Sequence, residues 1–258
     1  MFGDVWFGEV RPGQVMYGKD FIMIETQGNI KRITKKGRYY EVDGTLYPSV
    51  TTILNYYPKF EPFWKWKYTN PDADIILKEA GEYGTNVHKA IEKTLNSGLD
   101  ITEYVDLTEK EKKSVNLFGN WLTNLKKHKV EVVDIEKMVI GDGYGGTIDL
   151  VLKVDDTFWI IDIKTSKGLW ITHELQLSAY KHALLNQNFL DLQKIAKPGY
   201  GIIDIPENYK LALLHINHNL DKYEFKEVED NFDVFLAILK IFNFEQLRTT
   251  SNKRDKGP

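Results

Sequence analysis

Hydrophobic and polar residues alternate over several short stretches of the chain, which is the pattern of β-strands. Residues 19–47 carry short apolar pairs and a turn at Asp43-Gly44, which is typical of small strands joined by a hairpin. Beyond residue 130, runs of Val, Ile and aromatic residues are separated by turn-forming residues and predict longer strands. These later strands are expected over residues 131–140, 146–154, 157–164, 199–205 and 210–218.

Elsewhere the apolar residues recur with the period of a helix. One helix is expected to begin near Thr85 or Asn86 and to end at Ser97-Gly98, where glycine favours termination. A second helix is expected to begin at Thr108, because Glu111 three residues later completes a capping box. Two further helices are expected over residues 170–187 and 221–250.

This order of elements predicts a mixed α/β fold. A central mixed β-sheet would be flanked by helices, with an N-terminal helical subdomain inserted before it. The expected organisation is N-terminal strands (1–46), a helical subdomain (47–130), a sheet core (131–220), a C-terminal helix (221–250) and a basic tail (251–258).

The composition narrows the class of protein. The 258 residues are 42% hydrophobic and carry a net charge of −3, so the chain can bury a core but does not attract nucleic acid over its whole surface. A DNA-binding groove would therefore have to be local. The absence of cysteine excludes disulfides, thiolate zinc sites and iron–sulfur clusters. No apolar run is long enough for a membrane and no secretory signal is visible, so we expect a cytoplasmic protein.

The stretch from Phe158 to Thr165 carries the strongest chemical signal. Its large apolar residues indicate a strand that is buried on both faces, yet it contains Asp162 and Lys164. Residues i and i+2 of a strand share a face, so these two charges point the same way. Buried charges need a partner, and here the partner is the other charge of the pair, a metal ion or a substrate.

A second carboxylate joins this pair when the neighbouring strand is aligned with it. If Asp155-Asp156 forms a two-residue turn, counting outward along both strands places Asp149 directly opposite Asp162, with Cβ atoms roughly 5 Å apart. Two carboxylates at that spacing repel by about 3 kcal/mol at an effective dielectric constant of about 20. A divalent cation between them removes this repulsion, and oxygen-rich sites suit Mg²⁺ or Mn²⁺. The alternative is an ordinary ion pair between Asp162 and Lys164.

Five short motifs occur in an order that resembles a known family. The motifs are Tyr47-Pro48-Ser49-Val50-Thr51-Thr52-Ile53-Leu54, Gly84-Thr85-Asn86-Val87-His88, Gly146-Thr147-Ile148-Asp149, Asp162-Ile163-Lys164-Thr165 and Gln176-Leu177-Ser178-Ala179-Tyr180. The set is similar to that of the PD-(D/E)XK nuclease superfamily, and it resembles in particular the RecB-like branch and its bacteriophage-type exonucleases. Isoleucine stands at position 148 in place of the proline of the superfamily's name, as is usual in that branch. The resemblance implies a restriction-endonuclease-like core.

The resemblance also implies a metal centre that binds Mg²⁺ or Mn²⁺ and has no iron–sulfur cluster. Asp149 and Asp162 would be ligands, together with the main-chain carbonyl of Ile163. His88 would be a further ligand, and its imidazole favours Mn²⁺ more than an all-oxygen site would. Glu136 would lie beside the ligands without being one of them.

The same resemblance implies which residues act in catalysis. Lys164 would orient or deprotonate the attacking water and offset charge in the transition state. Gln176 and Tyr180 lie one helical turn apart on one face, and would contact the lysine, the water or the DNA backbone.

Aromatic residues and lysines are interleaved over residues 56–68. We interpret these aromatic residues first as the core of the helical subdomain. The alternative is a groove in which the bases of a single strand stack on the rings while lysines contact phosphates. In that case the DNA-binding residues would be Lys59, Trp64, Lys65, Trp66 and Lys67, together with Thr165.

These features favour a metal-dependent DNA exonuclease that hydrolyses phosphodiester bonds from DNA ends in replication, recombination or repair. Its partner would be DNA with single-stranded ends threaded through a cleft, and its location the cytoplasm of a bacterial or phage-infected host cell. The alternatives are a structure-selective endonuclease and a non-catalytic DNA-binding module on the same fold.

Overall fold

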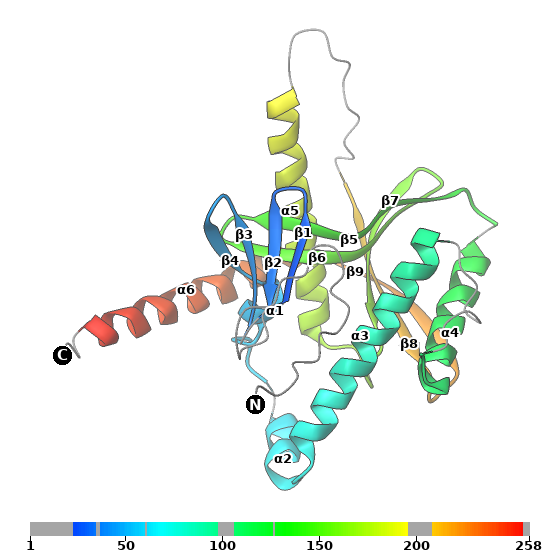
Figure 1. Cartoon of the computed structure of the whole chain (residues 1–258), viewed down its shortest axis with the longest axis horizontal. Coiled ribbons are helices and arrows are strands. Elements are labelled where there is room, and N and C mark those ends of the chain that lie inside the picture. The colour runs from blue at the N-terminus through cyan, green and yellow to red at the C-terminus, as the bar shows by residue number, and fades with distance from the viewer. Residues whose placement is uncertain are drawn as a thin grey trace, which may run out of the picture.

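A computed structural model of the protein describes residues 23–34, 37–59, 61–97, 106–125, 127–195 and 208–254. Within these ranges the chain forms two β-sheets and a set of helices that pack around the larger sheet (Figure 1). The expected mixed α/β class is confirmed. The strand expected over residues 199–205 lies outside the described residues.

The smaller sheet is an antiparallel meander at the N-terminal end of the described chain. Its strands are β1 (Met23–Gln27), β2 (Ile30–Thr34), β3 (Arg38–Val42) and β4 (Thr45–Pro48). The hairpin predicted at Asp43-Gly44 is confirmed and joins β3 to β4. Both turn residues have positive φ, 50° at Asp43 and 79° at Gly44, which is the backbone that Asp-Gly hairpin turns require.

The larger sheet has the order β5-β6-β7-β8-β9. Its strands are β5 (Val130–Gly141), β6 (Tyr144–Val154), β7 (Thr157–Lys164), β8 (Lys210–Asn217) and β9 (Lys222–Val228). Only β7 and β8 run parallel, so the sheet is mixed. The β6–β7 hairpin has the predicted register, because Val154 pairs with Thr157 and Leu150 with Ile161.

Helices cover both faces of this sheet. The helices are α1 (Val50–Leu54), α2 (Glu61–Thr69), α3 (Ala73–Ser97), α4 (Glu109–Leu125), α5 (Ile171–Ile195) and α6 (Phe232–Arg254). On one face, α1, α5 and α6 pack against sheet residues such as Val151 and Ile160. On the other face, α3 and α4 pack against Leu152 and Ile161. The helices of segment 47–130 therefore lie on both faces of the sheet.

Several element boundaries differ from the sequence expectation, among them the end of α5, which continues to Ile195 rather than ending near residue 187. Helix α3 begins at Ala73 rather than near Thr85, because Gly81 and Gly84 do not interrupt it. Strand β9 occupies residues expected to begin the C-terminal helix, and it was missed because it is an edge strand with mostly exposed polar side chains. Helix α6 continues to Arg254, four residues into the expected basic tail.

The capping box predicted at Thr108 is confirmed and ties two helices together. The main-chain N–H of Thr108 donates to Glu111 Oε2 at 2.7 Å, and that of Glu111 donates to Thr108 Oγ1 at 3.3 Å. Asn86 of α3 donates to the other oxygen of the same carboxylate at 2.8 Å. The start of α4 is thereby fixed to the part of α3 that carries His88.

Among the described helices, none combines the length and the apolar character that a membrane-spanning segment needs.

Candidate metal centre

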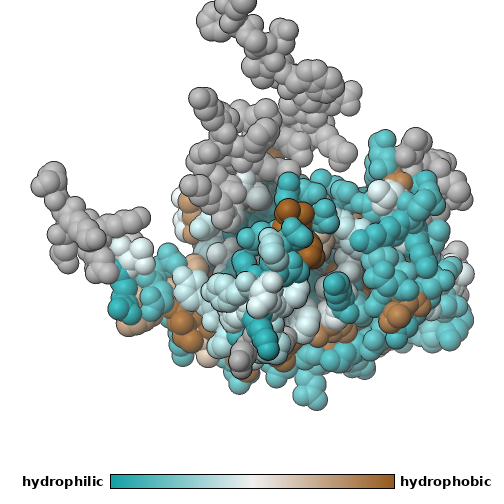
Figure 2. Space-filling view, turned by 90° about the horizontal axis from the view of Figure 1, so that it is seen from below, coloured by the Kyte–Doolittle hydropathy of each residue, from teal (hydrophilic) through white to brown (hydrophobic). Residues whose placement is uncertain are grey.

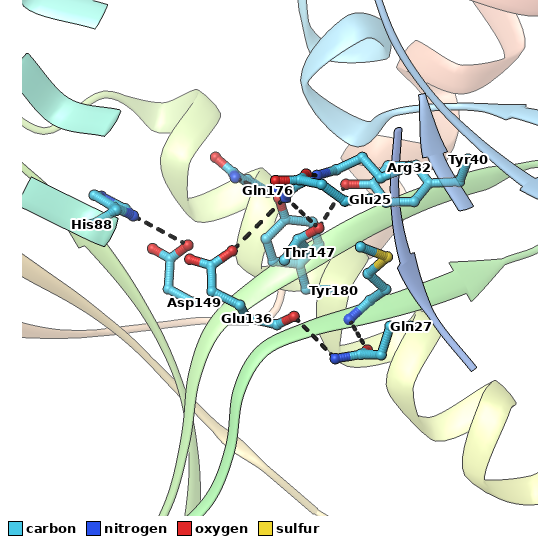
Figure 3. Close-up of polar contacts among 11 residues, drawn as sticks. Glu25, Gln27, Arg32, Tyr40, His88, Glu136, Thr147, Asp149, Gln176 and Tyr180 are labelled. Carbon is cyan, nitrogen blue, oxygen red and sulfur yellow. Dashed lines mark hydrogen bonds and ion pairs between the residues drawn. The ribbon is translucent and has the colours of Figure 1, made fainter. Parts of the chain in front are cut away.

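Three side chains from three different elements converge at the edge of the larger sheet (Figure 3). They are His88 from α3, Glu136 from β5 and Asp149 from β6. One ligand atom from each lies within 4.8 Å of the others, and Nδ1 of His88 is 3.5 Å from Oδ1 of Asp149. All three side chains are partly buried. One imidazole and two carboxylates can hold a divalent cation at such distances.

The β5–β6 hairpin explains why Glu136 meets Asp149. The turn at Asp142-Gly143 pairs Ile135 with Leu150 and Lys137 with Ile148, so positions 136 and 149 face each other between these pairs. The sequence predicts Glu136 beside the ligands, whereas the structure brings its carboxylate into the group with His88 and Asp149. Applying the same strand count to the Asp142-Gly143 turn would have identified this position from sequence.

Asp162 lies on the opposite side of Asp149, on β7. Its carboxylate is almost fully buried, and Oδ2 forms an ion pair with Nζ of Lys164 at 2.6 Å. This oxygen accepts no hydrogen bond of normal geometry from any described residue. The structure thus lines up Glu136, Asp149 and Asp162 across β5, β6 and β7, although only the first two share the group with His88.

The mutual electrostatics of these groups shift their proton affinities. Burial alone would lower the pKa of His88, but the charge and hydrogen bond of Asp149 and the charge of Glu136 outweigh it and raise the pKa to about 9. Burial and the charge of Asp149 raise the pKa of Glu136 to about 7. Burial, opposed by Lys164 but assisted by Asp149, raises the pKa of Asp162 to about 6. Glu136 is therefore partly protonated near pH 7, whereas Asp162 takes up a proton as the pH falls below about 6.

Asp149 behaves in the opposite way. Burial would raise its pKa, but the charges of His88 and Lys164 and a main-chain hydrogen bond outweigh burial and lower it. That bond is donated by the N–H of Ile163 to Oδ2 of Asp149 at 2.7 Å. The N–H of Ile163 therefore orients the carboxylate, while its carbonyl remains a predicted ligand.

A line of polar contacts leads from Asp162 away from the cluster. Nζ of Lys164 donates to Oε1 of Gln176 at 3.1 Å, and Nε2 of Gln176 donates to the hydroxyl of Tyr180 at 2.7 Å. Gln176 and Tyr180 are both buried on α5. Burial raises the pKa of Tyr180 well above its ordinary value, so the phenol stays protonated. These contacts hold the lysine ammonium at the carboxylate of Asp162.

The glycines of the motifs make the close approaches that this arrangement needs. A Cβ at Gly146 would lie 2.3 Å from the ring of Tyr180, and a Cβ at Gly84 would lie 3.2 Å from Oγ1 of Thr165. The first contact lets α5 reach the sheet beside Asp149, and the second brings α3 onto the end of β7. The motif that carries Gly146 therefore packs against the motif that carries Tyr180, and the motif that carries Gly84 packs against the one that carries Thr165.

A cleft of about 370 Å³ opens beside the metal centre. It runs between α3, α4 and the ends of β7 and β8, and no carboxylate is among its lining residues. Three lysines, Lys110, Lys164 and Lys167, supply positive charge to its lining, and three histidines, His88, His173 and His218, also line it. Burial, together with Lys164 and His215, lowers the pKa of His173 to about 3, as expected in a positive environment. The cleft therefore suits an anion, although the chain as a whole is acidic.

The aromatic residues near α2 do not form a core, contrary to the first interpretation of the sequence. No described residue between 56 and 68 is fully buried, and Trp64 is 40% and Tyr68 82% exposed. Trp64 stacks on Tyr68 with ring centroids 6.0 Å apart, and Nζ of Lys59 lies 4.9 Å above the Phe63 ring. Among the described elements, α2 packs mainly against α3 rather than on a sheet, which explains the exposure.

The other predicted DNA-binding residues are divided between two places. Thr165 lines the cleft beside Lys164. Lys59, Trp64, Lys65, Trp66 and Lys67 are not among the cleft residues, and Lys67 is paired with Asp74 at 3.1 Å. Figure 2 views the molecule from the side on which α2 lies in Figure 1, and this face is mostly hydrophilic with scattered hydrophobic patches.

The donor set fits a divalent metal ion. Carboxylate oxygens and an imidazole nitrogen suit Mg²⁺ or Mn²⁺, and the buried Oδ2 of Asp162, which is ion-paired with Lys164, accepts no hydrogen bond of normal geometry from the described residues.

Comparisons with known proteins identify the family. Residues 67–250 match the family model described as the PD-(D/E)XK nuclease superfamily. A search of curated proteins gives no match. A solved structure described as "Crystal structure of SSO0001" is 15% identical over 62% of this chain and 71% of that chain, and its TM-score of 0.29 is too low to support an argument. Because the family model spans well over half of the chain, the protein belongs to the PD-(D/E)XK nuclease superfamily.

Proposed function

We propose that the protein is a metal-dependent deoxyribonuclease that degrades DNA from its ends. The observation that carries the proposal is the convergence of His88, Glu136 and Asp149 beside the Asp162–Lys164 pair. A buried ion pair alone would not need a second group of acids and an imidazole next to it. The motif set continues to favour the RecB-like branch within the superfamily.

In this proposal His88, Glu136, Asp149 and Asp162 hold the metal, with the carbonyl of Ile163. When bound, Mg²⁺ or Mn²⁺ supplies Lewis-acid polarisation of the scissile phosphate. The imidazole of His88 makes Mn²⁺ the better fit of the two. The N–H of Ile163 keeps the carboxylate of Asp149 turned toward the site.

The chain's own groups prepare the substrate for attack. The ammonium of Lys164 orients the attacking water and offsets negative charge that develops on the phosphoryl oxygens. Gln176 holds the lysine in place, and Tyr180 holds Gln176. The cleft would receive backbone phosphates next to the scissile bond, because three lysines and no carboxylate line it.

Two observations support action at DNA ends. His88 comes from α3 while the acids come from the sheet, so the centre lies between two elements rather than on an open surface. Such a site admits a strand that enters from an end more readily than the middle of a duplex. The exposed aromatic residues of α2, with Lys59 and Lys65, can hold single-stranded DNA by stacking and phosphate contact.

The test is digestion of end-labelled linear DNA, single- and double-stranded, beside covalently closed circles. Each substrate is incubated with Mg²⁺, Mn²⁺ or EDTA, and Asp149→Asn serves as the inactive control. We expect metal-dependent loss of linear DNA while circles survive. Cleavage of closed single-stranded circles at the linear rate would favour the endonuclease alternative, and cleavage in EDTA would overturn the proposal.

A further inference from the structure

Glu136 has an unusual backbone for a residue within a strand. Its φ is 49°, which is the left-handed region that residues with a Cβ seldom adopt. The strand carries a register shift shortly before it, between Val132 and Asp134. A non-glycine residue persists in this conformation only when its surroundings hold it there, and such residues concentrate at functional sites. The groups that contact Glu136 are therefore candidates for residues that position it in the metal centre.

The side chain of Gln27, on the smaller sheet, forms hydrogen bonds with the main chain around Glu136. Its Oε1 accepts the N–H of Met138 at 2.7 Å, and its Nε2 donates to the carbonyl of Glu136 at 3.4 Å (Figure 3). Both main-chain groups lie on β5, an edge strand, so no further strand of the larger sheet pairs with them. The side chain of Gln27 takes the place of that strand at the residue with left-handed backbone.

Arg32 of the same small sheet approaches the carboxylate of Glu136. Its Nη1 lies 3.8 Å from Oε2 of Glu136 and donates to Oγ1 of Thr147 at 3.1 Å. A close ion pair with Glu25 on β1 holds the guanidinium from the other side. The arginine is thus fixed by two partners and presents its charge to the acid.

The smaller sheet is itself firmly seated on β5 and β6. Tyr40 is buried, its hydroxyl lies 2.8 Å from Oγ1 of Thr147, and a Cβ at Gly145 would come within 2.7 Å of its ring. Tyr40 and Ile30 also form a small hydrophobic cluster with Met138. Because this contact is tight, the positions of Gln27 and Arg32 relative to Glu136 are determined by the fold.

We propose that the smaller N-terminal sheet positions one ligand of the metal centre. Gln27 fixes the left-handed backbone at Glu136, and Arg32 orients its carboxylate toward His88 and Asp149. Both are positioning residues, because neither belongs to the metal-binding group. The inference rests on the proposed function, since it takes Glu136 to be a metal ligand.

The test is the equilibrium affinity for Mn²⁺, measured by electron paramagnetic resonance on folded protein without DNA. We expect Gln27→Ala and Arg32→Gln each to weaken binding roughly tenfold, the usual order for losing a group that orients a ligand. In a Glu136→Gln background, Gln27→Ala should add little, because the two residues act through one contact. In cleavage assays, excess Mn²⁺ should restore most of the kcat of Gln27→Ala.

Matched controls come from the same strands. Thr26→Ala and Lys31→Gln change exposed neighbours of Gln27 and Arg32 and should bind Mn²⁺ like the unmodified protein. If Glu136→Gln weakens Mn²⁺ binding while Gln27→Ala and Arg32→Gln leave it within twofold, the positioning role is wrong and the metal centre stands. If Glu136→Gln changes neither Mn²⁺ binding nor cleavage, Glu136 is no ligand and the inference is overturned. If Gln27→Ala does not fold, the Mn²⁺ affinity of Arg32→Gln alone is the test, and an affinity within twofold of the unmodified protein shows that the positioning role is wrong.

Discussion

The metal centre and helix α2 combine charged residues with aromatic or apolar neighbours, but they differ in burial and in the range of their contacts. At the centre, Asp162 is almost fully buried, and Asp149 is contacted by groups from α3 and β7. On α2, Trp64 and Tyr68 are exposed and stack on each other four residues apart. Preorganisation by distant elements suits catalysis, whereas an exposed, locally supported surface suits adaptable binding. Changes at the centre should therefore reduce turnover, and changes on α2 should reduce affinity.

Removal of the metal should have the largest effect. EDTA should abolish cleavage, and Mn²⁺ or Mg²⁺ should restore it, because the proposed mechanism depends on the metal as the Lewis acid that polarises the scissile phosphate. Ca²⁺ should support DNA binding better than cleavage, since its coordination is looser. DNA binding through α2 should persist in EDTA, as a gel-shift measurement can check. Loss of binding and cleavage together would remove the distinction between the two regions.

Replacement of Lys164 should have the second-largest effect on cleavage. Lys164→Gln should lower kcat by at least ~10²-fold, the usual order for losing one transition-state contact. Mn²⁺ affinity should change far less, because Lys164 contacts Asp162 and Gln176 and is not proposed as a metal ligand. Single-turnover kinetics, normalised to the folded fraction from circular dichroism, measure this. Full activity per folded molecule would show that Lys164 only pairs with Asp162.

The affinity for Mn²⁺ should depend on pH. A cation must displace the protons from His88, with a pKa of about 9, from Glu136, with a pKa of about 7, and from Asp162, with a pKa of about 6. Below these values protons compete with the metal, so affinity should rise by about a hundredfold from pH 6 to pH 7 and should continue to rise, less steeply, up to about pH 9. Calorimetric titration across this range provides the measurement. An affinity independent of pH would mean that these carboxylates are not ligands.

Removal of an exposed ring on α2 should have the smallest effect. Trp64→Ala should weaken binding of single-stranded DNA about fivefold or more, since stacking is worth roughly 1–3 kcal/mol per base. The kcat at saturating DNA should stay unchanged. Phe244→Ala, which removes another exposed ring on α6, is the control and should bind normally. An equal loss in both variants would mean that α2 has no special role in binding.

Much of the site could be predicted because it depends on local rules. The two-residue turn at Asp155-Asp156 sets the β6–β7 register, and this alone brings Asp149 and Asp162 onto neighbouring strands. The capping box at Thr108 depends on residues three positions apart. Such features follow from spacing and turn chemistry.

The features of the site that could not be predicted depend on contacts between residues far apart in the sequence. The sequence predicts a helix start near Thr85, but α3 begins at Ala73 and continues through Gly84, whose missing side chain leaves room for Thr165. The strand count places Glu136 opposite Asp149, but it does not reveal the left-handed backbone at Glu136, which Gln27 contacts from more than a hundred residues away. The exposure of the α2 rings follows from the packing of α2 mainly against another helix, α3. None of these contacts is encoded by a local pattern.

The central claim is that His88, Glu136 and Asp149 form the metal site, and Mn²⁺ binding to Asp149→Asn tests it most directly. The asparagine keeps the size of the side chain and can still accept the N–H of Ile163, so the fold should be retained. Electron paramagnetic resonance titration should show a Mn²⁺ affinity at least tenfold weaker than that of the unmodified protein. Equal affinity in the two proteins would contradict the account.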